Sequence, residues 1–553
     1  MINSPTDIAE TLAIIATALI LLFAVVISGI ISRSLPFSLP LPLIQIVLGA
    51  CIGLIANLRV TLEPDIFFLL FLPPLLFLDG WRIPADELAK DGWTVLELAF
   101  GLVVFTVVGV GLFVHLMIPA MPLAVAFALA SVVSPTDPIA VSAIAQRVPI
   151  PKRMMHILEG ESLLNDASGL VCLRFAVAAA LTGVFSLHEA FLTFLWLAIG
   201  GVAIGFAVTW AITRAKDWVS RQLGEESGSQ ILISLLIPFA AYLLAEHLHC
   251  SGILAAVAAG VTMSYAESSG NAEAITRIRR TTVWDMIQLS ANGAIFVLLG
   301  EQLPQIITSA IETVRVTGHQ NPWWLVVYVL AINAALALLR FIWVWVSVQF
   351  TLLRTGRRQA SPSWRIIAAM SFAGVRGAIT LAGVLTLPLT MNDGSAFPAR
   401  DLAIFLAAGV IIVSLIAASI GLPAFLKGLR MPAEPTHEAE EDAARVAAAE
   451  AAIAEVERVQ HTLSEGRRDA DLYVTAASRI MEMYRQRIAS RGKNGEEAAL
   501  ARRNERIERD LRLAAVRAER SEIFRRRRKR QIDAETARKL IRELDLLEAR
   551  YAS

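Results

Sequence analysis

Long apolar runs fill the first 430 residues of the chain, whereas charged positions dominate the remainder. Runs of about 20 apolar residues, enough to cross a bilayer as a helix, recur thirteen times in this first part. Their centres lie near Ile20, Leu48, Leu72, Val107, Ala130, Leu170, Ile204, Ile237, Ala258, Ile295, Ala334, Gly377 and Ile412. The pattern predicts an all-α integral membrane domain over residues 1–430 and a mostly helical, water-soluble tail over residues 431–553.

The lysine and arginine side chains between the apolar runs gather in every second loop. Sixteen of them lie in these loops, and the loops between hold three. The dense set is Arg33, Arg82, Lys90, Arg147, Lys152, Arg153, Arg214, Lys216, Arg221, Arg277, Arg279, Arg280, Arg354, Arg357, Arg358 and Arg365, and the sparse set is Arg59, Arg315 and Arg400. Because basic loops stay on the cytoplasmic side, we expect the N-terminus outside, the tail in the cytoplasm and an odd number of spans.

Two interruptions fall at matching places in the two halves of the membrane domain. Thirteen spans divide into six, one and six, so the two six-span units are inverted relative to each other, as in many secondary transporters. The fifth span breaks at residues 134–138, SPTDP, and the twelfth, fifth in its own half, carries GVRG at residues 374–377. Discontinuous helices in corresponding positions indicate the ion site.

Composition agrees with a membrane protein. Mean hydropathy is +0.59 and 56% of the residues are hydrophobic, well above a soluble domain of this length. The three cysteines, Cys51, Cys172 and Cys250, all lie in apolar runs, so we interpret them as packing residues rather than as a disulfide or metal site.

The fifth span carries a carboxylate, Asp137, between Pro135 and Pro138. A charge at bilayer depth costs at least about 2.5–3.5 kcal/mol, so it needs a partner or a task. The prolines remove backbone donors, and the carbonyls they free can bind a cation. The alternative is a helix N-cap, with Thr136 or Asp137 capping the segment that begins at Pro138.

The sixth span places Ser162 and Asp166 four residues apart, and therefore on one helical face. Glu161 and Asn165 form a second pair on the adjoining face. Carboxylate and hydroxyl oxygens from Asp166, Ser162 and Thr136 suit a small hard cation. The alternative is a polar seam between packed helices.

Two further membrane charges need partners. Arg376 lies between Gly374 and Gly377, and we expect it to pair with Glu161 first and with Asp137 second, because a buried guanidinium requires a carboxylate. For Asp79 we expect an ordinary position at a cytoplasmic helix end near Arg82.

The tail is rich in alanine, glutamate and arginine, residues that favour helix. Its run RRRRKR, residues 525–530, is either a solvated face or a surface for anionic lipid at the inner leaflet. Nucleic-acid binding is not expected of a tail tethered to a membrane.

Four segments resemble the signatures of bacterial monovalent cation/proton antiporters of the NhaP and NHE type. They are FLDGWR (77–82), SPTDPIAV (134–141), EGESLLNDASGLV (159–171) and GVRGAITLA (374–382), and they occur in the family's order. The resemblance covers the whole membrane domain. It implies thirteen helices in inverted repeats, with a dimerisation domain, a moving core domain and a homodimer.

The resemblance also implies roles for individual residues. Asp166 is the residue that carries the ion and the proton, and Thr136, Asp137 and Ser162 complete a shell for Na⁺. Asn165 and Glu161 support that shell, and Arg376 is the stabilising arginine near the crossing helices. An asparagine before Asp166, where electrogenic exchangers have two aspartates, resembles the electroneutral branch.

The function we expect is secondary transport that exchanges Na⁺, K⁺ or Li⁺ for H⁺ across the bacterial cytoplasmic membrane. Its partners are the cation, the proton, membrane lipid and a second copy of the chain, with no cofactor beyond the transported ions. A cation channel using the same buried charges is the alternative, although no repeated selectivity-filter loop is present. An intramembrane enzyme is disfavoured because the chain lacks GxSxG and HExxH motifs.

Overall fold

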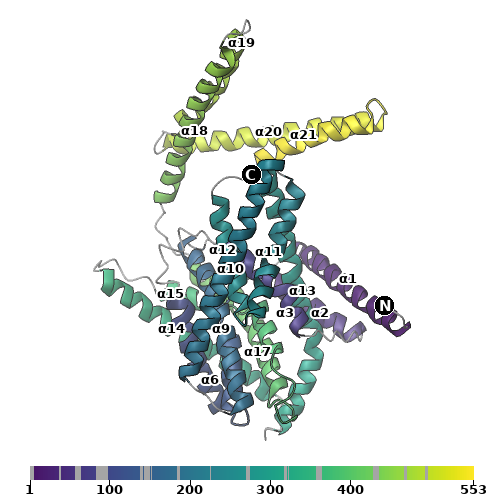
Figure 1. The fold of residues 1–553 in the computed structure, drawn as a ribbon, viewed down its shortest axis with the longest axis vertical. Helices are drawn as coiled ribbons and strands as arrows, with labels where there is room; N and C mark the ends of the chain where they lie inside the picture. The colour runs from purple at the N-terminus through teal and green to yellow at the C-terminus, as the bar shows by residue number, and fades with distance from the viewer. Residues whose placement is uncertain are drawn as a thin grey trace. The chain divides into compact units, whose positions relative to one another are not determined.

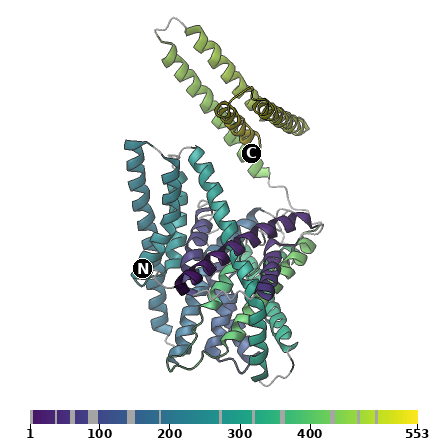
Figure 2. The same ribbon diagram turned by 90° about the vertical axis from the view of Figure 1, so that its right-hand side faces the viewer.

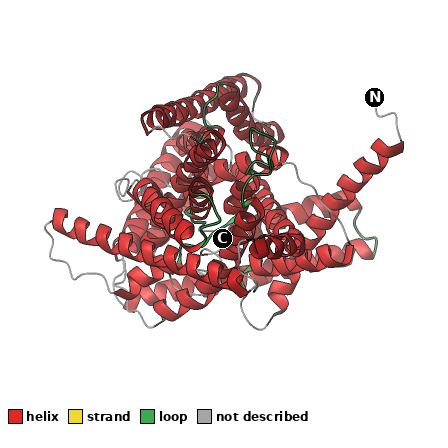
Figure 3. Cartoon of the chain, turned by 90° about the horizontal axis from the view of Figure 1, so that it is seen from below, coloured by secondary structure: helices red, strands yellow, loops and turns green. Residues whose placement is uncertain are grey.

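The computed structural model describes residues 5–35, 39–56, 64–82, 97–137, 141, 150, 152–183, 187–224, 226–268, 274–316, 321, 323–355, 364–427, 435–465, 470–491 and 496–552. The chain forms two compact units, Met1–Leu429 and Arg430–Ser553. The predicted boundary at residues 430 and 431 lies outside the described residues. Figure 3 shows helices throughout the described part, whose only strand-like pairing is an isolated bridge between Thr390 and Ala396.

The first unit is a bundle of apolar helices (Figure 1). They are α1 (Pro5–Ser34), α2 (Leu41–Ala56), α3 (Pro64–Arg82), the π-helix η1 (Glu97–Leu102), α6 (Val103–Met117), α7 (Leu123–Val133), α9 (Lys152–Thr182), α10 (Leu187–Leu223), α11 (Ser227–His247), α12 (Gly252–Ser268), α13 (Ala274–Val316), α14 (Trp323–Thr355), α15 (Trp364–Phe372), α16 (Ala378–Leu385) and α17 (Arg400–Leu426). Within the described residues, eight helices are long and apolar enough to cross a membrane, and three shorter helices are also apolar. The predicted all-α membrane architecture is therefore confirmed, while the number of thirteen spans stays a prediction.

One group of helices in this unit forms what we call the scaffold: α1 to α3 and α10 to α13. Helix α2 packs along α13, and α12 packs along both α3 and α10. Figure 2 shows α1 crossing the bundle obliquely, over α2 and α13. Gly49 of α2 faces the backbone of Val297, and Gly300 of α13 faces that of Ile46, so a side chain at either glycine would collide with main-chain atoms. These glycines allow α2 and α13 to touch along their backbones.

The other group, which we call the core bundle, contains η1, α6, α7, α9 and α14 to α17. Helix α7 packs between α6 and α9, and α17 packs against α14, α15 and α16. Two helices stop inside this bundle. Helix α7 ends at Val133, and the segment 373–377 separates α15 from α16. The predicted interruptions of the fifth and twelfth spans are thus both present.

The second unit consists of two helical hairpins, α18 (Pro435–Ser464) with α19 (Ala470–Arg491) and α20 (Glu496–Arg528) with α21 (Ala534–Ala552) (Figure 1). Val516 of α20 and Leu544 of α21 are buried in the second hairpin. Asp533 caps the N-terminus of α21, because its Oδ1 accepts the backbone N–H groups of Glu535 and Thr536 at 2.8 and 2.7 Å. These hydrogen bonds, led by those from Thr536, lower the pKa of the Asp533 carboxyl.

Candidate cation site

The two interrupted helices meet through their backbones. In a continuous helix the N–H of Asp137 would donate to the carbonyl of Val133, four residues earlier. It donates instead to the carbonyl of Val375 at 2.7 Å, which joins the end of α7 to the break between α15 and α16. Pro135 explains the interruption, since it has no N–H and disfavours helical geometry just before it. Pro138, the second predicted breaker, lies outside the described residues.

Arg376 takes the place of the missing helical donors. Its Nε donates to the carbonyl of Val133 at 2.8 Å, and its Nη1 donates to the carbonyl of Gly374. Its backbone N–H donates to Oγ of Ser414 in α17 at 3.2 Å. Because carbonyl ends of helices carry partial negative charge, a buried cation beside both α7 and α15 stabilises the crossing. Arg376 thus lies at the crossing of the two interrupted helices, and its role as the stabilising arginine stays a prediction.

Gly377 makes room for the carboxylate of Asp137. A Cβ atom at position 377 would overlap Oδ2, Cβ and Cγ of Asp137. On the other side of the crossing, Gly169 of α9 faces the ring of Pro135 and the carbonyl of Ser131. The crossing can thus lie directly against α9, the helix that carries the second predicted carboxylate.

Glu161 pairs with Arg340, and the predicted pair of Glu161 with Arg376 is wrong. Nη1 and Nη2 of Arg340 donate to the two carboxylate oxygens of Glu161 at 2.5 and 2.7 Å, and both side chains are buried. Nε of Arg340 also donates to the carbonyl of Met370 at 3.0 Å, so this side chain links α14, α9 and α15. The donors of Arg376 are directed at helix carbonyls, which leaves Glu161 to the arginine on α14.

Arg340 was missed in the sequence although a signal for it exists. It is a single charge within the apolar run of α14, and a lone charge at membrane depth requires a partner. The same argument identified Arg376, which the two neighbouring glycines made more conspicuous.

A short hydrogen-bonded chain links this ion pair to the break in α7. Nδ2 of Asn165 donates to Oγ1 of Thr136 at 3.0 Å, and that hydroxyl donates to Oε1 of Glu161 at 3.1 Å. All three side chains are buried, and Oδ1 of Asn165 has no hydrogen-bond partner among the described residues. These two hydrogen bonds fix the hydroxyl of Thr136 between Asn165 and Glu161.

Asp166 and Ser162 lie one turn apart on α9, and both are buried. Asp79 lies in the last turn of α3, three residues before Arg82, so its predicted position at a helix end is confirmed. Its expected neighbour Arg82 forms an ion pair with Asp285 of α13 and donates to Gln288 at 2.6 Å.

The arrangement of these side chains suits reversible binding of a cation. No three histidine, cysteine or carboxylate side chains in the described part of the chain come together as a holder for a metal ion. Asp166 and Ser162 share one face of α9, Asp137 lies at the break after α7, and the hydroxyl of Thr136 is tied to α9 through Asn165 and Glu161. Few charged oxygens give hard cations a weak site, and a buried carboxylate can hold a proton in place of the cation.

Comparison with known proteins shows similarity to cation/proton exchangers. The family described as "Sodium/hydrogen exchanger, transmembrane" matches residues 18–428. An uncharacterised Na⁺/H⁺ exchanger of Escherichia coli, YjcE, is 43% identical over 541 residues, which cover 96% of this chain and 98% of the relative. A sodium, potassium, lithium and rubidium/H⁺ antiporter of Bacillus pumilus is 44% identical over 413 residues, covering 74% of this chain and 61% of the relative.

The fold also resembles a solved structure. The sodium proton antiporter MjNhaP1 of Methanocaldococcus jannaschii superposes with a TM-score of 0.56 at 17% identity, covering 75% of this chain and 99% of that one. At this identity the likeness concerns the fold.

Proposed function

Because the chain belongs to the sodium/hydrogen exchanger family, we propose that it exchanges a monovalent cation, sodium first, for a proton around Asp166. The observation that carries this proposal is the position of Asp166, buried on α9 where Gly169 of the same helix packs against Pro135 at the crossing of two interrupted helices. The printed name of the Bacillus pumilus relative supports cation/proton antiport and keeps potassium and lithium as candidates.

Competition for one carboxylate couples the two fluxes in this proposal. Asp166 holds either the cation or the proton, and it cannot hold both. Asp137, Ser162 and Thr136 supply the other oxygens for the cation. Release of the cation leaves an uncompensated buried charge, which costs free energy until a proton arrives. Cation release and proton uptake therefore follow each other.

The stoichiometry we propose is one for one, and therefore electroneutral. Asn165 is neutral, and the charge of Glu161 is compensated by Arg340 through two hydrogen bonds. These two residues then keep their protonation throughout the cycle. One-for-one exchange also requires Asp137 to keep its protonation state through the cycle, so that Asp166 is the residue whose occupancy changes.

Alternating access follows from the division of the membrane unit into a scaffold and a core bundle. Residues Asp137, Asp166 and Arg376 all belong to the core bundle, so movement of that bundle along the scaffold would carry the site. We place the protein in the bacterial cytoplasmic membrane as a homodimer that serves pH homeostasis, without a resident cofactor. The density of basic residues in alternate loops supports a cytoplasmic tail.

Purified protein in proteoliposomes, loaded with a pH-sensitive dye, tests the proposal. Addition of sodium, potassium or lithium outside should alkalinise the lumen only when the ion is transported inward in exchange for internal protons. A potassium gradient clamped with valinomycin sets the membrane potential independently. Sodium current that needs no proton counterflow would identify the channel alternative and overturn the proposal.

A further inference from the structure

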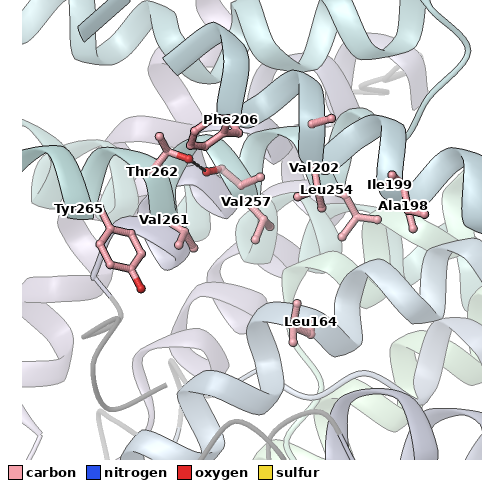
Figure 4. Close-up of a pocket in the computed structure, with 12 residues that line it drawn as sticks. Leu164, Ala198, Ile199, Val202, Phe206, Leu254, Val257, Val261, Thr262 and Tyr265 are labelled. Carbon is pink, nitrogen blue, oxygen red and sulfur yellow. Dashed lines mark hydrogen bonds between the residues drawn. The ribbon is translucent and has the colours of Figure 1, made fainter. Parts of the chain in front are cut away.

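An open cavity of about 820 Å³ lies between the core bundle and the scaffold (Figure 4). We call it the crevice and define it by six residues: Leu164 of α9, Ile199, Val202 and Phe206 of α10, and Val257 and Val261 of α12. Figure 4 shows Leu164 facing the side chains of α10 and α12 across the gap. Its volume falls within the range of about 300–1,000 Å³ that is usual for small-molecule sites.

The lining of the crevice excludes ions and polar substrates. Its members are almost entirely hydrocarbon, and the hydroxyl of Thr262 is already used, since it donates to the carbonyl of Ala258 at 2.6 Å. Helix α10 is among the helices apolar enough to cross a membrane. Ile199 and Phe206 are 65% and 54% exposed, so the crevice opens toward the surroundings of that helix. At this depth the surroundings are hydrocarbon chains of the bilayer.

One end of the crevice leads to polar groups. The face of α10 that carries Phe206 continues one turn later at Trp210 and another turn later at Arg214. Trp210 is exposed, and the guanidinium of Arg214 lies 5.8 Å from its ring centroid. Arg214 forms no ion pair with any other described residue. On α12, the hydroxyl of Tyr265 points into the gap (Figure 4).

This order of side chains matches a phospholipid. Tryptophan and tyrosine concentrate at the membrane interface, where the headgroups lie, and an unpaired guanidinium binds phosphate with two parallel hydrogen bonds. Arg214 belongs to one of the basic loops expected on the cytoplasmic side. The apolar crevice, the aromatic rings and the arginine therefore follow each other as acyl chain, interface and phosphate do.

We propose that the crevice binds a phospholipid of the inner leaflet, with one acyl chain between α9 and the helices α10 and α12 and with its phosphate at Arg214 and Tyr265. Leu164 sits on α9 between Ser162 and Asp166. The bound chain therefore fills the space beside the helix that carries the cation site, where a deformable hydrocarbon allows α9 to slide. The proposal concerns lipid binding and depends on the membrane placement alone, so it stands or falls separately from cation exchange.

Photolabelling of the full-length protein in vesicles tests the acyl-chain position. The probe is a phosphatidylglycerol with a diazirine in the middle of one acyl chain, and peptide mass spectrometry locates the adducts. We expect label on the crevice residues well above the level on other exposed apolar faces. Val202→Trp combined with Ala258→Phe should reduce crevice labelling to that background. Val108→Trp on α6 is the matched control, since Val108 and Val202 are 45% and 47% exposed.

Ala203→Leu is a milder variant that fills the crevice if the double substitution does not fold. Even labelling over all apolar faces, or unchanged crevice labelling in a folded filled variant, would overturn the proposal. Chemical cross-links between two copies through crevice positions would overturn it too, because a second protein copy would then occupy the space.

The headgroup is tested by native mass spectrometry of protein extracted from vesicles of phosphatidylglycerol and phosphatidylcholine. Arg214→Gln should lose retained phosphatidylglycerol, whereas Arg221→Gln, at an exposed arginine of the same helix, should retain it. Equal retention in both variants would show that Arg214 does not hold the phosphate.

Discussion

Both carboxylate oxygens of Glu161 are held by Arg340, in a pair whose side chains are 1% and 3% exposed. The pair joins α9, which carries Asp166, to α14 and, through the carbonyl of Met370, to α15. It therefore links the helix that carries Asp166 to the interrupted helix α15. Burying such a pair costs desolvation free energy, and in return the pair specifies one arrangement of the helices that it joins.

Removal of one partner of this pair should be strongly destabilising. Glu161→Gln or Arg340→Gln leaves a buried charge without compensation, and we expect a loss of about 3–5 kcal/mol in each case. The double variant should recover part of this loss, because no bare charge remains. Thermal unfolding in detergent is measured for the wild-type protein, the two single variants and the double variant, which together form a double-mutant cycle. Arg174→Gln is the control, since its ion pair with Glu246 is exposed.

A second double-mutant cycle distinguishes the two arginines. Glu161→Gln with Arg376→Gln should give nearly additive losses, because the donors of Arg376 go to the carbonyls of Val133 and Gly374. A large coupling between Glu161 and Arg376, with none between Glu161 and Arg340, would contradict the pairing.

Gly377→Ala should impair exchange and lower stability, because the added Cβ would overlap the carboxylate of Asp137. The side chain of Asp137 or the crossing backbone must then move. Gly29→Ala on α1 is the control, since a Cβ there meets no atom within 4 Å. Sodium-driven proton flux and thermal unfolding are measured for both variants. Normal flux in Gly377→Ala would mean that Asp137 is not held against this glycine in the working protein.

Asn165→Asp should change the charge balance of exchange. The new carboxylate lies beside Asp166 and replaces the amide that donates to Thr136. A second titrating group can carry a second proton, so we expect the exchange equilibrium to respond to membrane potential in this variant. In the wild-type protein it should not respond. The readout is the sodium/proton flux balance under a potassium–valinomycin clamp, and a response in the wild-type protein would contradict one-for-one exchange.

The tail offers a prediction about pH. The pKa of Asp533 is lowered in the folded hairpin by hydrogen bonds from Thr536 and Glu535. Its stabilising effect is therefore complete above the ordinary aspartate pKa and is lost as the pH falls through the lowered value. Asp533→Ala should remove the effect at all pH values. Hydrogen exchange of the amides at the start of α21, corrected for intrinsic rates, measures it; equal protection in both proteins at neutral pH would refute the cap.

The proline and glycine residues allowed the two helix interruptions to be predicted from the sequence. Pro135 and the glycines around Arg376 marked both interruptions, because each has a direct backbone consequence. The partner of Glu161 was not found in the same way, because Arg340 was overlooked and because the choice between Arg340 and Arg376 depends on how α14 and α15 pack.

Asp166→Asn in proteoliposomes is the most direct test of the account. Asparagine keeps the size of the side chain but cannot exchange a cation for a proton, so sodium-driven proton flux should vanish while folding and insertion stay normal. Asp401→Asn, at an exposed aspartate at the start of α17, should leave the flux unchanged. Substantial sodium-driven proton flux in a correctly inserted Asp166→Asn protein would contradict the central role of this carboxylate.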